Sequence, residues 1–301
     1  MIAVVDYHKG NLMSVERGIE AAGGEALITD DAAAIARADG IVLPGVGAFA
    51  DASATMIELG QMDAIRERIA AGVPFLGICL GMHLLFEEGV EGAPGEDDEE
   101  SSHNARGLAV LPGVVVRMPK AAPDGASYKV PHVGWNTVAP PTGSGLSAGL
   151  ASAGSSATRR FAAQPSASCA ALLRSDEGID GAQTVAPLPA DAKPAAPTGL
   201  PTGASGACGT RFVNAAPPSG CSPSFGCPIF DGIPAGEYFY FTHSYIAPGG
   251  PFAVGETTHS VTFPSAVQYG EACFGVQFHP EKSSDAGAAV LRNFVRIVEG
   301  R

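Results

Sequence analysis

The sequence has few basic residues and no long apolar segment. Lysine and arginine total 18 against 31 aspartates and glutamates, which gives a formal net charge of −13 at pH 7. This balance argues against nucleic acid or an anionic membrane as the main partner, because both attract positive protein surfaces. No apolar run reaches the roughly 20 residues that cross a bilayer, and the first residues lack the basic segment of a signal peptide. We expect a soluble, cytoplasmic protein.

Cysteine pairs of the kind that hold structural zinc are also missing. The chain has six cysteines, and no two of them have the C-x-x-C spacing that such sites prefer. Cys221 and Cys227 are near enough in sequence to pair if oxidised, but a reducing compartment favours free thiols. We therefore expect free thiols and no metal site.

Aromatic residues nearly disappear between residues 140 and 228. This segment is rich in Ala, Pro, Gly and Ser, has no sustained apolar periodicity, and holds only three aromatic side chains. Such a composition buries too little apolar surface to offset the entropy lost on ordering. We expect residues 1–139 and 229–301 to form one domain, interrupted by a disordered insertion at 140–228. A small independent domain within the insertion is the alternative.

The two flanks of that segment carry regular patterns. Short apolar runs at 2–5, 26–29, 41–43 and 73–78 alternate with helical segments. This β-α-β order predicts an α/β fold with a mainly parallel central sheet and helices on both faces. Strand-like runs between residues 237 and 278 predict additional mixed strands in the C-terminal half. Functional groups in such a fold gather at the carboxyl ends of the strands.

One short motif, GICLGM at residues 77–82, stands at such a strand end. Cys79 lies between the apolar run 73–78 and a helix-like run at 80–88, with glycines two positions before and after it. This is the nucleophile-elbow arrangement with cysteine in place of serine. The N–H groups and dipole of the following helix would stabilise a thiolate and, later, an oxyanion. The alternative is a buried structural cysteine between packing glycines.

A thiolate nucleophile needs a base and a group that orients the base. His279 follows an apolar run and precedes a proline, and Glu281 stands two residues further on, where its carboxylate can reach the imidazole. That contact would fix the histidine tautomer and stabilise the imidazolium. Cys79, His279 and Glu281 together predict a catalytic triad. The alternative for His279 by itself is an incidental histidine in a strand-end turn.

The motifs GICLGM and GVQFHPE (residues 275–281) resemble those of the class I, triad-type glutamine amidotransferases. Four further segments are similar to the amidotransferase subunits of imidazole glycerol phosphate synthases: VDYHKGNLMSV at 5–15, LPGVGAF at 43–49, KVPHVGWN at 129–136 and YFTHSY at 240–245. The resemblance implies a flavodoxin-like domain that hydrolyses glutamine to glutamate without a metal or organic cofactor. It also implies a partner, the cyclase subunit, which receives the ammonia in histidine biosynthesis.

The resemblance further implies roles for particular residues. Cys79 would attack the side-chain amide of glutamine, with His279 serving as base and then as acid, oriented by Glu281. The oxyanion and substrate contacts would come from Gly45, Val46, Gly47, Leu80, His83, Ser244 and Tyr245. The interface with the partner would include Lys129, His132, Trp135 and Asn136.

Two positions depart from the family pattern. His8 stands where we expect glycine, which predicts a bulkier loop near the partner. His83 stands where the family usually has glutamine, and imidazole offers one donor and one acceptor in place of the richer set of an amide.

Two other functions remain as alternatives. The first is another triad amidotransferase, of the anthranilate or pyridoxal phosphate synthase type, and the segments 129–136 and 240–245 disfavour it. The second is a partner-binding relative without turnover, which the intact triad disfavours.

Overall fold

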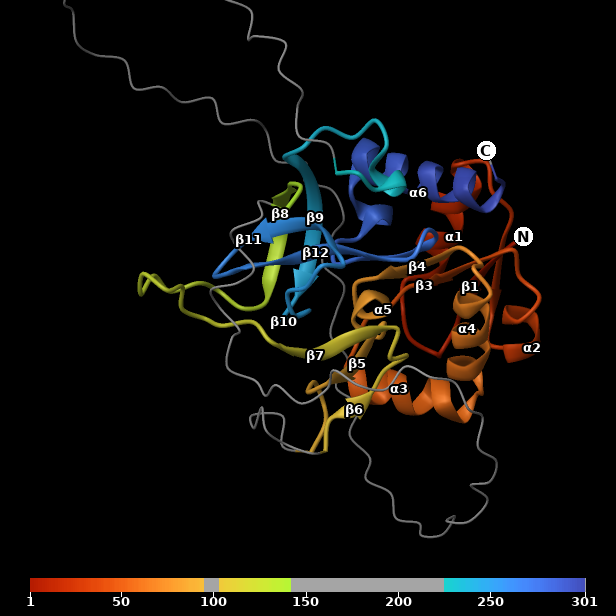
Figure 1. Cartoon of the computed structure of the whole chain (residues 1–301), viewed down its shortest axis with the longest axis horizontal. Helices are drawn as coiled ribbons and strands as arrows, with labels where there is room; N and C mark the ends of the chain where they lie inside the picture. Colours follow the sequence, from red (N-terminus) through yellow and green to blue (C-terminus); the bar gives the residue numbers. More distant parts are fainter. Residues whose placement is uncertain (95–102, 142–224, 301) are drawn as a thin grey trace, which may run out of the picture. The chain divides into compact units, whose positions relative to one another are not determined.

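The structure, a computed structural model, describes residues 1–94, 103–141 and 225–300 (Figure 1). A seven-stranded sheet forms its centre, with the order β11-β12-β13-β4-β3-β1-β2. The strands are β1 (Ile2–Val5), β2 (Ala26–Thr29), β3 (Gly40–Leu43), β4 (Phe75–Ile78), β11 (Ala253–Thr258), β12 (Thr262–Tyr269) and β13 (Cys273–Val276). The pairs from β13 to β2 are all parallel, and β11 and β12 are attached antiparallel. The expected α/β fold is confirmed.

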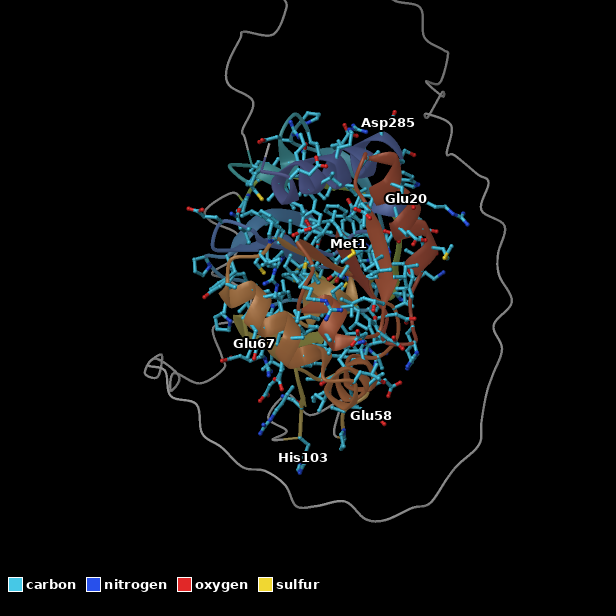
Figure 2. All side chains as sticks on the ribbon, turned by 90° about the vertical axis from the view of Figure 1, so that its right-hand side faces the viewer. Met1, Glu20, Glu58, Glu67, His103 and Asp285 are labelled. Atoms are coloured by element: carbon cyan, nitrogen blue, oxygen red, sulfur yellow. The ribbon has the colours of Figure 1, made fainter. Side chains whose placement is uncertain are left out.

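Helices cover both faces of this sheet. They are α1 (Leu12–Ala21), α2 (Ala32–Ile35), α3 (Phe49–Glu58), α4 (Gln61–Ala70) and α6 (Ser284–Val298). Along β1, Ala3 and Val5 pack with α2, α3 and α4, whereas Ile2 and Val4 pack with α1 and α6. Alternate residues of a strand point to opposite faces, so a strand covered on both sides is apolar throughout. Figure 2 shows Glu20 and Asp285 of the α1–α6 layer on one side of the molecule and Glu58 and Glu67 on the other.

Two smaller sheets complete the described part of the fold. The order β10-β7-β5-β6 builds a four-stranded sheet, and β8 pairs antiparallel with β9. These strands are β5 (Phe86–Gly89), β6 (Ala105–Arg106), β7 (Leu111–Arg117), β8 (His132–Val138), β9 (Glu237–His243) and β10 (Tyr245–Ile246). The β8–β9 ladder joins the two flanks of the chain across residues 142–224. It therefore makes one folded unit of segments far apart in the sequence.

Two expected elements differ from those observed. The helix expected over residues 80–88 is only α5 (Leu80–His83), and β5 begins three residues later. The carbonyl groups of Leu84 and Leu85 accept hydrogen bonds from the backbone of residues 108, 110 and 111, so they are not available to continue a helix. Within the strand-like region at 237–278, the pattern of residues 252–263 predicts one continuous strand, but the structure divides them between β11 and β12, which are joined by a turn.

Most of the expected insertion at 140–228 lies outside the described residues. Its described C-terminal edge belongs to the core, because Phe225 and Cys227 are buried and Phe225 stacks on Phe230 with ring centroids 4.2 Å apart. Phe230 lies in the short 3-10 helix η1 (Pro228–Phe230), which packs against α6. The folded part therefore resumes before residue 229. Among the described helices, none combines the length and the apolar character that a membrane crossing requires.

Candidate active site

Cys79 occupies a strained turn between β4 and α5. Its backbone has φ 53° and ψ −105°, a region that side chains other than glycine rarely enter. Its N–H donates a 2.7 Å hydrogen bond to the carbonyl of Val276 in the neighbouring strand. The flanking glycines are required by space, since a Cβ on Gly81 would overlap the carbonyl oxygen of Leu43 and one on Gly77 would overlap that of Gly81. This packing holds the sulfur at the carboxyl end of the sheet.

The elbow helix is shorter than we expected. With four residues, α5 has little macrodipole, so any anion stabilisation there depends on the local N–H groups of the turn.

His279 and Glu281 lie beside this turn because β13 runs parallel to β4. Val276 pairs with Ile78 at the ends of the two strands. His279 follows in the loop, and Glu281 lies in the 3-10 helix η2 (Pro280–Lys282). The Nδ1 atom of His279 lies 2.9 Å from Oε1 of Glu281, and the two side chains are 3% and 2% exposed. The other ring nitrogen, Nε2, is buried with no hydrogen-bond partner among the described protein atoms.

The negative groups around His279 favour the protonated form of its imidazole. Burial acts to lower the pKa of His279, but the negative charge of Cys79 and the contact with Glu281 outweigh burial and raise it to about 10. A buried carboxylate behind an imidazole that faces a sulfur is the arrangement of a thiolate–imidazolium nucleophile. The structure thus brings together the three predicted triad residues, although they follow two strands, β4 and β13, that are far apart in the sequence.

A cavity of about 410 Å³ opens in front of Cys79, a size typical of small-molecule sites. Six of the predicted oxyanion and substrate residues line it together with Cys79: Val46, Gly47, Leu80, His83, Ser244 and Tyr245. Gly45 does not line it. That glycine lies where a Cβ would overlap the hydroxyl of Tyr7 and come within 2.8 Å of Leu80 Cβ, so it allows the loop to approach α5.

Sequence reasoning missed five lining residues: Ala48, Glu91, Pro131, Thr242 and His243. Four of them stand inside or next to motifs that we singled out, so proximity to those motifs was the available signal. Glu91 follows β5 in a segment without a motif, and only the fold brings it to the cavity. Among the described residues, no group of three or more His, Cys, Asp or Glu side chains is placed to hold a metal ion.

Comparison with known proteins decides the family. The pattern of the family described as Glutamine amidotransferase class-I matches residues 3–166. A protein of Moorella thermoacetica named imidazole glycerol phosphate synthase subunit HisH is 34% identical over 299 residues, covering 99% of this chain and 95% of the relative. The protein of that name from Geobacillus thermodenitrificans is 32% identical over 303 residues, covering 100% and 98%. The chain belongs to the class I glutamine amidotransferases.

A solved structure supports the fold of this amidotransferase. It is described as a crystal structure of glutamine amidotransferase and matches with a TM-score of 0.51 at 13% identity, covering 100% of both chains. At that identity the likeness concerns the fold alone.

His132, one of the four predicted interface residues of this amidotransferase, is buried rather than exposed. The residues of β8 alternate, so that Val133 and Trp135 are exposed while His132 is only 4% exposed and stacks on Phe241. Asn136 is half-buried and bonds to the same imidazole. Lys129 is exposed, and its carbonyl oxygen accepts a 2.9 Å hydrogen bond from His259. Of the four predicted interface residues, Trp135 and Lys129 are therefore the accessible ones.

The two departures from the family pattern have defined surroundings. His8 has φ 65°, so an L-residue holds the left-handed backbone that favours glycine, and its N–H donates to Oδ1 of Asp6 at 2.7 Å. His83 is fully buried, and its Nε2 lies 2.7 Å from Oε1 of Gln277. Burial lowers the pKa of His83 to about 4, although the bond to Gln277 acts to raise it. The imidazole is therefore neutral at neutral pH.

Proposed function

We propose that this protein is the ammonia-supplying subunit of an imidazole glycerol phosphate synthase. It would hydrolyse glutamine to glutamate and pass the ammonia to a cyclase subunit in histidine biosynthesis. The observation that best supports this chemistry is the buried 2.9 Å contact between His279 Nδ1 and Glu281 Oε1. It leaves His279 Nε2 available to exchange a proton with Cys79. The relatives named HisH, similar over the full chain, support the choice among amidotransferases.

The triad geometry supports a two-step reaction. The Cys79 thiolate attacks the side-chain amide carbon of glutamine, and the His279 imidazolium then protonates the nitrogen as the C–N bond breaks and ammonia leaves. Neutral His279 next takes a proton from water, whose oxygen attacks the glutamyl thioester and releases glutamate and the thiolate. Glu281 stabilises the imidazolium in both steps.

The tetrahedral intermediates need donors for their oxyanion. We assign these to the N–H of Leu80, next to the nucleophile, and to one N–H of the loop 45–47. Gly47 has φ 104°, a backbone conformation that glycine adopts without strain. This freedom allows a peptide group of the loop to reorient toward the cavity. Ser244, Tyr245 and His83 line the cavity and are our candidates for contacts to glutamine.

An exposed apolar surface on the β8–β9 ladder is our candidate for the cyclase contact. We call it the docking ridge, and it consists of the exposed Val133, Trp135 and Tyr238 together with the half-buried Tyr240. Residues directly opposite on two strands share a face, and Trp135 faces Tyr240 while Val133 faces Thr242 of the cavity wall. Exposed aromatic side chains of this kind anchor protein interfaces. The ridge adjoins the cavity, so a cyclase bound there would lie next to the source of ammonia, in a heterodimer.

We also propose that the enzyme works in the cytoplasm. Among the described residues Cys79, Cys227 and Cys273 are free, and a thiol nucleophile needs a reducing compartment to stay reduced.

One experiment tests the proposed function. Glutamine hydrolysis is measured for the chain alone, with the cyclase subunit, and with the cyclase subunit plus its ribonucleotide ligand, for the wild type and Cys79→Ala. We expect the partner and its ligand to stimulate hydrolysis, and Cys79→Ala to abolish it. Equal activity with and without the partner would point to another triad amidotransferase. An inactive wild type in every mixture would point to a relative without turnover.

A further inference from the structure

His83, Gln277 and Cys79 form a continuous buried chain of polar contacts. His83 Nε2 lies 2.7 Å from Oε1 of Gln277, and Nε2 of Gln277 lies 3.6 Å from the sulfur of Cys79. Gln277 is fully buried and His83 is 3% exposed. Neither side chain belongs to the triad, and the reaction described above assigns no role to the contacts that join His83 through Gln277 to Cys79.

With Cys79 as the thiolate of the proposed reaction, the direction of these hydrogen bonds is fixed. A thiolate only accepts, so Gln277 must turn its N–H group toward Cys79 and its oxygen toward His83. The amide oxygen then needs a donor, and a neutral imidazole provides one only when its proton is on Nε2. Each contact is therefore consistent with a single arrangement: imidazole N–H to amide oxygen, and amide N–H to sulfur.

We propose that His83 is a positioning residue for the nucleophile: its Nε2–H fixes the Gln277 amide with an N–H directed at Cys79, and this favours the thiolate. Without that donor the amide is free to rotate and present its oxygen to the sulfur, which disfavours negative charge there. The inference rests on the proposed function only in taking Cys79 as the nucleophile.

Other charged and titratable groups surround this chain of contacts and remain in place when His83 is changed. His279, backed by Glu281, and the Tyr7 hydroxyl interact with Cys79, and His243 lies near His83. Tyr7 is neutral at ordinary pH, because burial raises its pKa well above the usual value. The effect of His83 is therefore an increment on the larger effect of His279.

The test measures the reactivity of Cys79 without glutamine. The chain is alkylated with iodoacetamide between pH 5 and 9.5, and modification of the Cys79 peptide is followed by mass spectrometry, because the chain has five other cysteines. His83→Leu, which removes the donor at similar volume, should move the midpoint of the pH profile up by about one unit. His83→Gln keeps an N–H donor and should stay within a few tenths of a unit of the wild type.

A double-variant comparison tests whether His83 acts through Gln277. Gln277→Leu should raise the midpoint at least as far as His83→Leu, and adding His83→Leu to it should change nothing further. Additive shifts would overturn the proposal, as would an unchanged midpoint in a His83→Leu protein that melts cooperatively.

A measurement on the wild type covers the case in which a variant does not fold. NMR of ¹⁵N-histidine-labelled protein should find the His83 proton on Nε2, and a proton on Nδ1 would overturn the proposal. The alkylation assay needs neither substrate nor partner, so it fails independently of the proposed function. A shifted midpoint in a protein without glutaminase activity refutes the function alone, and an unshifted midpoint in an active glutaminase refutes this inference alone.

Discussion

The Nδ1 atom of His132 lies 3.1 Å from Nε2 of His243, and the direction of this hydrogen bond is fixed from both sides. Asn136 Oδ1 accepts from the N–H of Thr137, so its Nδ2 donates to Nε2 of His132. At the other end, Nδ1 of His243 donates to the carbonyl oxygen of Tyr245 at 2.9 Å. Both imidazoles are therefore neutral single tautomers, and they connect the strand of the docking ridge to the segment that lines the cavity.

The first prediction concerns this connection. His132→Leu leaves the buried Nε2 of His243 without its donor, so we expect a loss of about 1–3 kcal/mol in unfolding free energy. The KM for glutamine should rise, because Tyr245 lines the cavity. Urea denaturation and steady-state kinetics measure the two effects. Val133→Ala, on the exposed face of the same strand, should change stability by no more than about 0.5 kcal/mol. Equal losses in the two variants would contradict the prediction.

The second prediction concerns pH and stability. Burial lowers the pKa of His83 to about 4, while the unfolded chain protonates this group near 6.5. Between about pH 6.5 and pH 4 the unfolded state binds a proton at His83 and the folded state does not. The free energy of unfolding therefore falls as the pH drops from about 6.5 to about 4. His83 alone contributes about 3 kcal/mol to this fall. Urea denaturation across that range should show a shallower dependence for His83→Gln, and parallel curves would contradict the assignment.

The third prediction concerns Glu281, the carboxylate of the proposed triad. Glu281 acts to raise the pKa of His279, so Glu281→Gln should lower this pKa and move the alkaline limb of glutaminase activity to lower pH. The variant keeps an acceptor for Nδ1 but loses its charge, and kcat should fall by roughly 10²–10⁴-fold. Glu271→Gln, at an exposed turn, serves as the control. A profile like that of the control would mean that Glu281 does not support the base.

The fourth prediction concerns the docking ridge. Trp135→Ala should weaken binding of the cyclase subunit by about tenfold or more, as truncation of a central aromatic anchor does. Hydrolysis should recover when the partner is saturating, because the triad is unchanged. Tyr269→Ala is a matched control, since Tyr269 is also an exposed aromatic but lies at the turn between β12 and β13. Isothermal titration gives both affinities, and a Kd unaffected by Trp135→Ala would remove the ridge as the interface.

The fifth prediction concerns the elbow. Gly81→Ala places a Cβ against the carbonyl oxygen of Leu43, and we expect a loss of about 3 kcal/mol or more, or failure to fold. Gly72→Ala has φ 80° but open space around it, so it should cost only about 1 kcal/mol, the strain of the backbone alone. Thermal melts distinguish crowding from backbone strain. Similar losses for the two variants would show that crowding at Gly81 is not what holds the turn.

Local sequence patterns determined the order of the strands and helices of this protein. The order of apolar runs and helices specified a mainly parallel sheet, because such strands need crossover connections. The two motifs around Cys79 and His279 predicted the triad, because each describes a short turn whose geometry depends on neighbouring residues. Glu281, two residues from His279, needed no tertiary information to be paired with it.

The tertiary structure decided which side chains meet across the sequence. Gln277 is 194 residues from His83 and 111 residues separate His132 from His243, so no local pattern could pair them. The inward position of His132 was equally out of reach, since alternation along a strand gives two faces but not which one is covered. Contacts of this kind depend on the topology that brings β8 to β9 and β13 to β4. The sequence alone therefore predicted the nucleophile and its base, and only the folded chain showed which residues contact them.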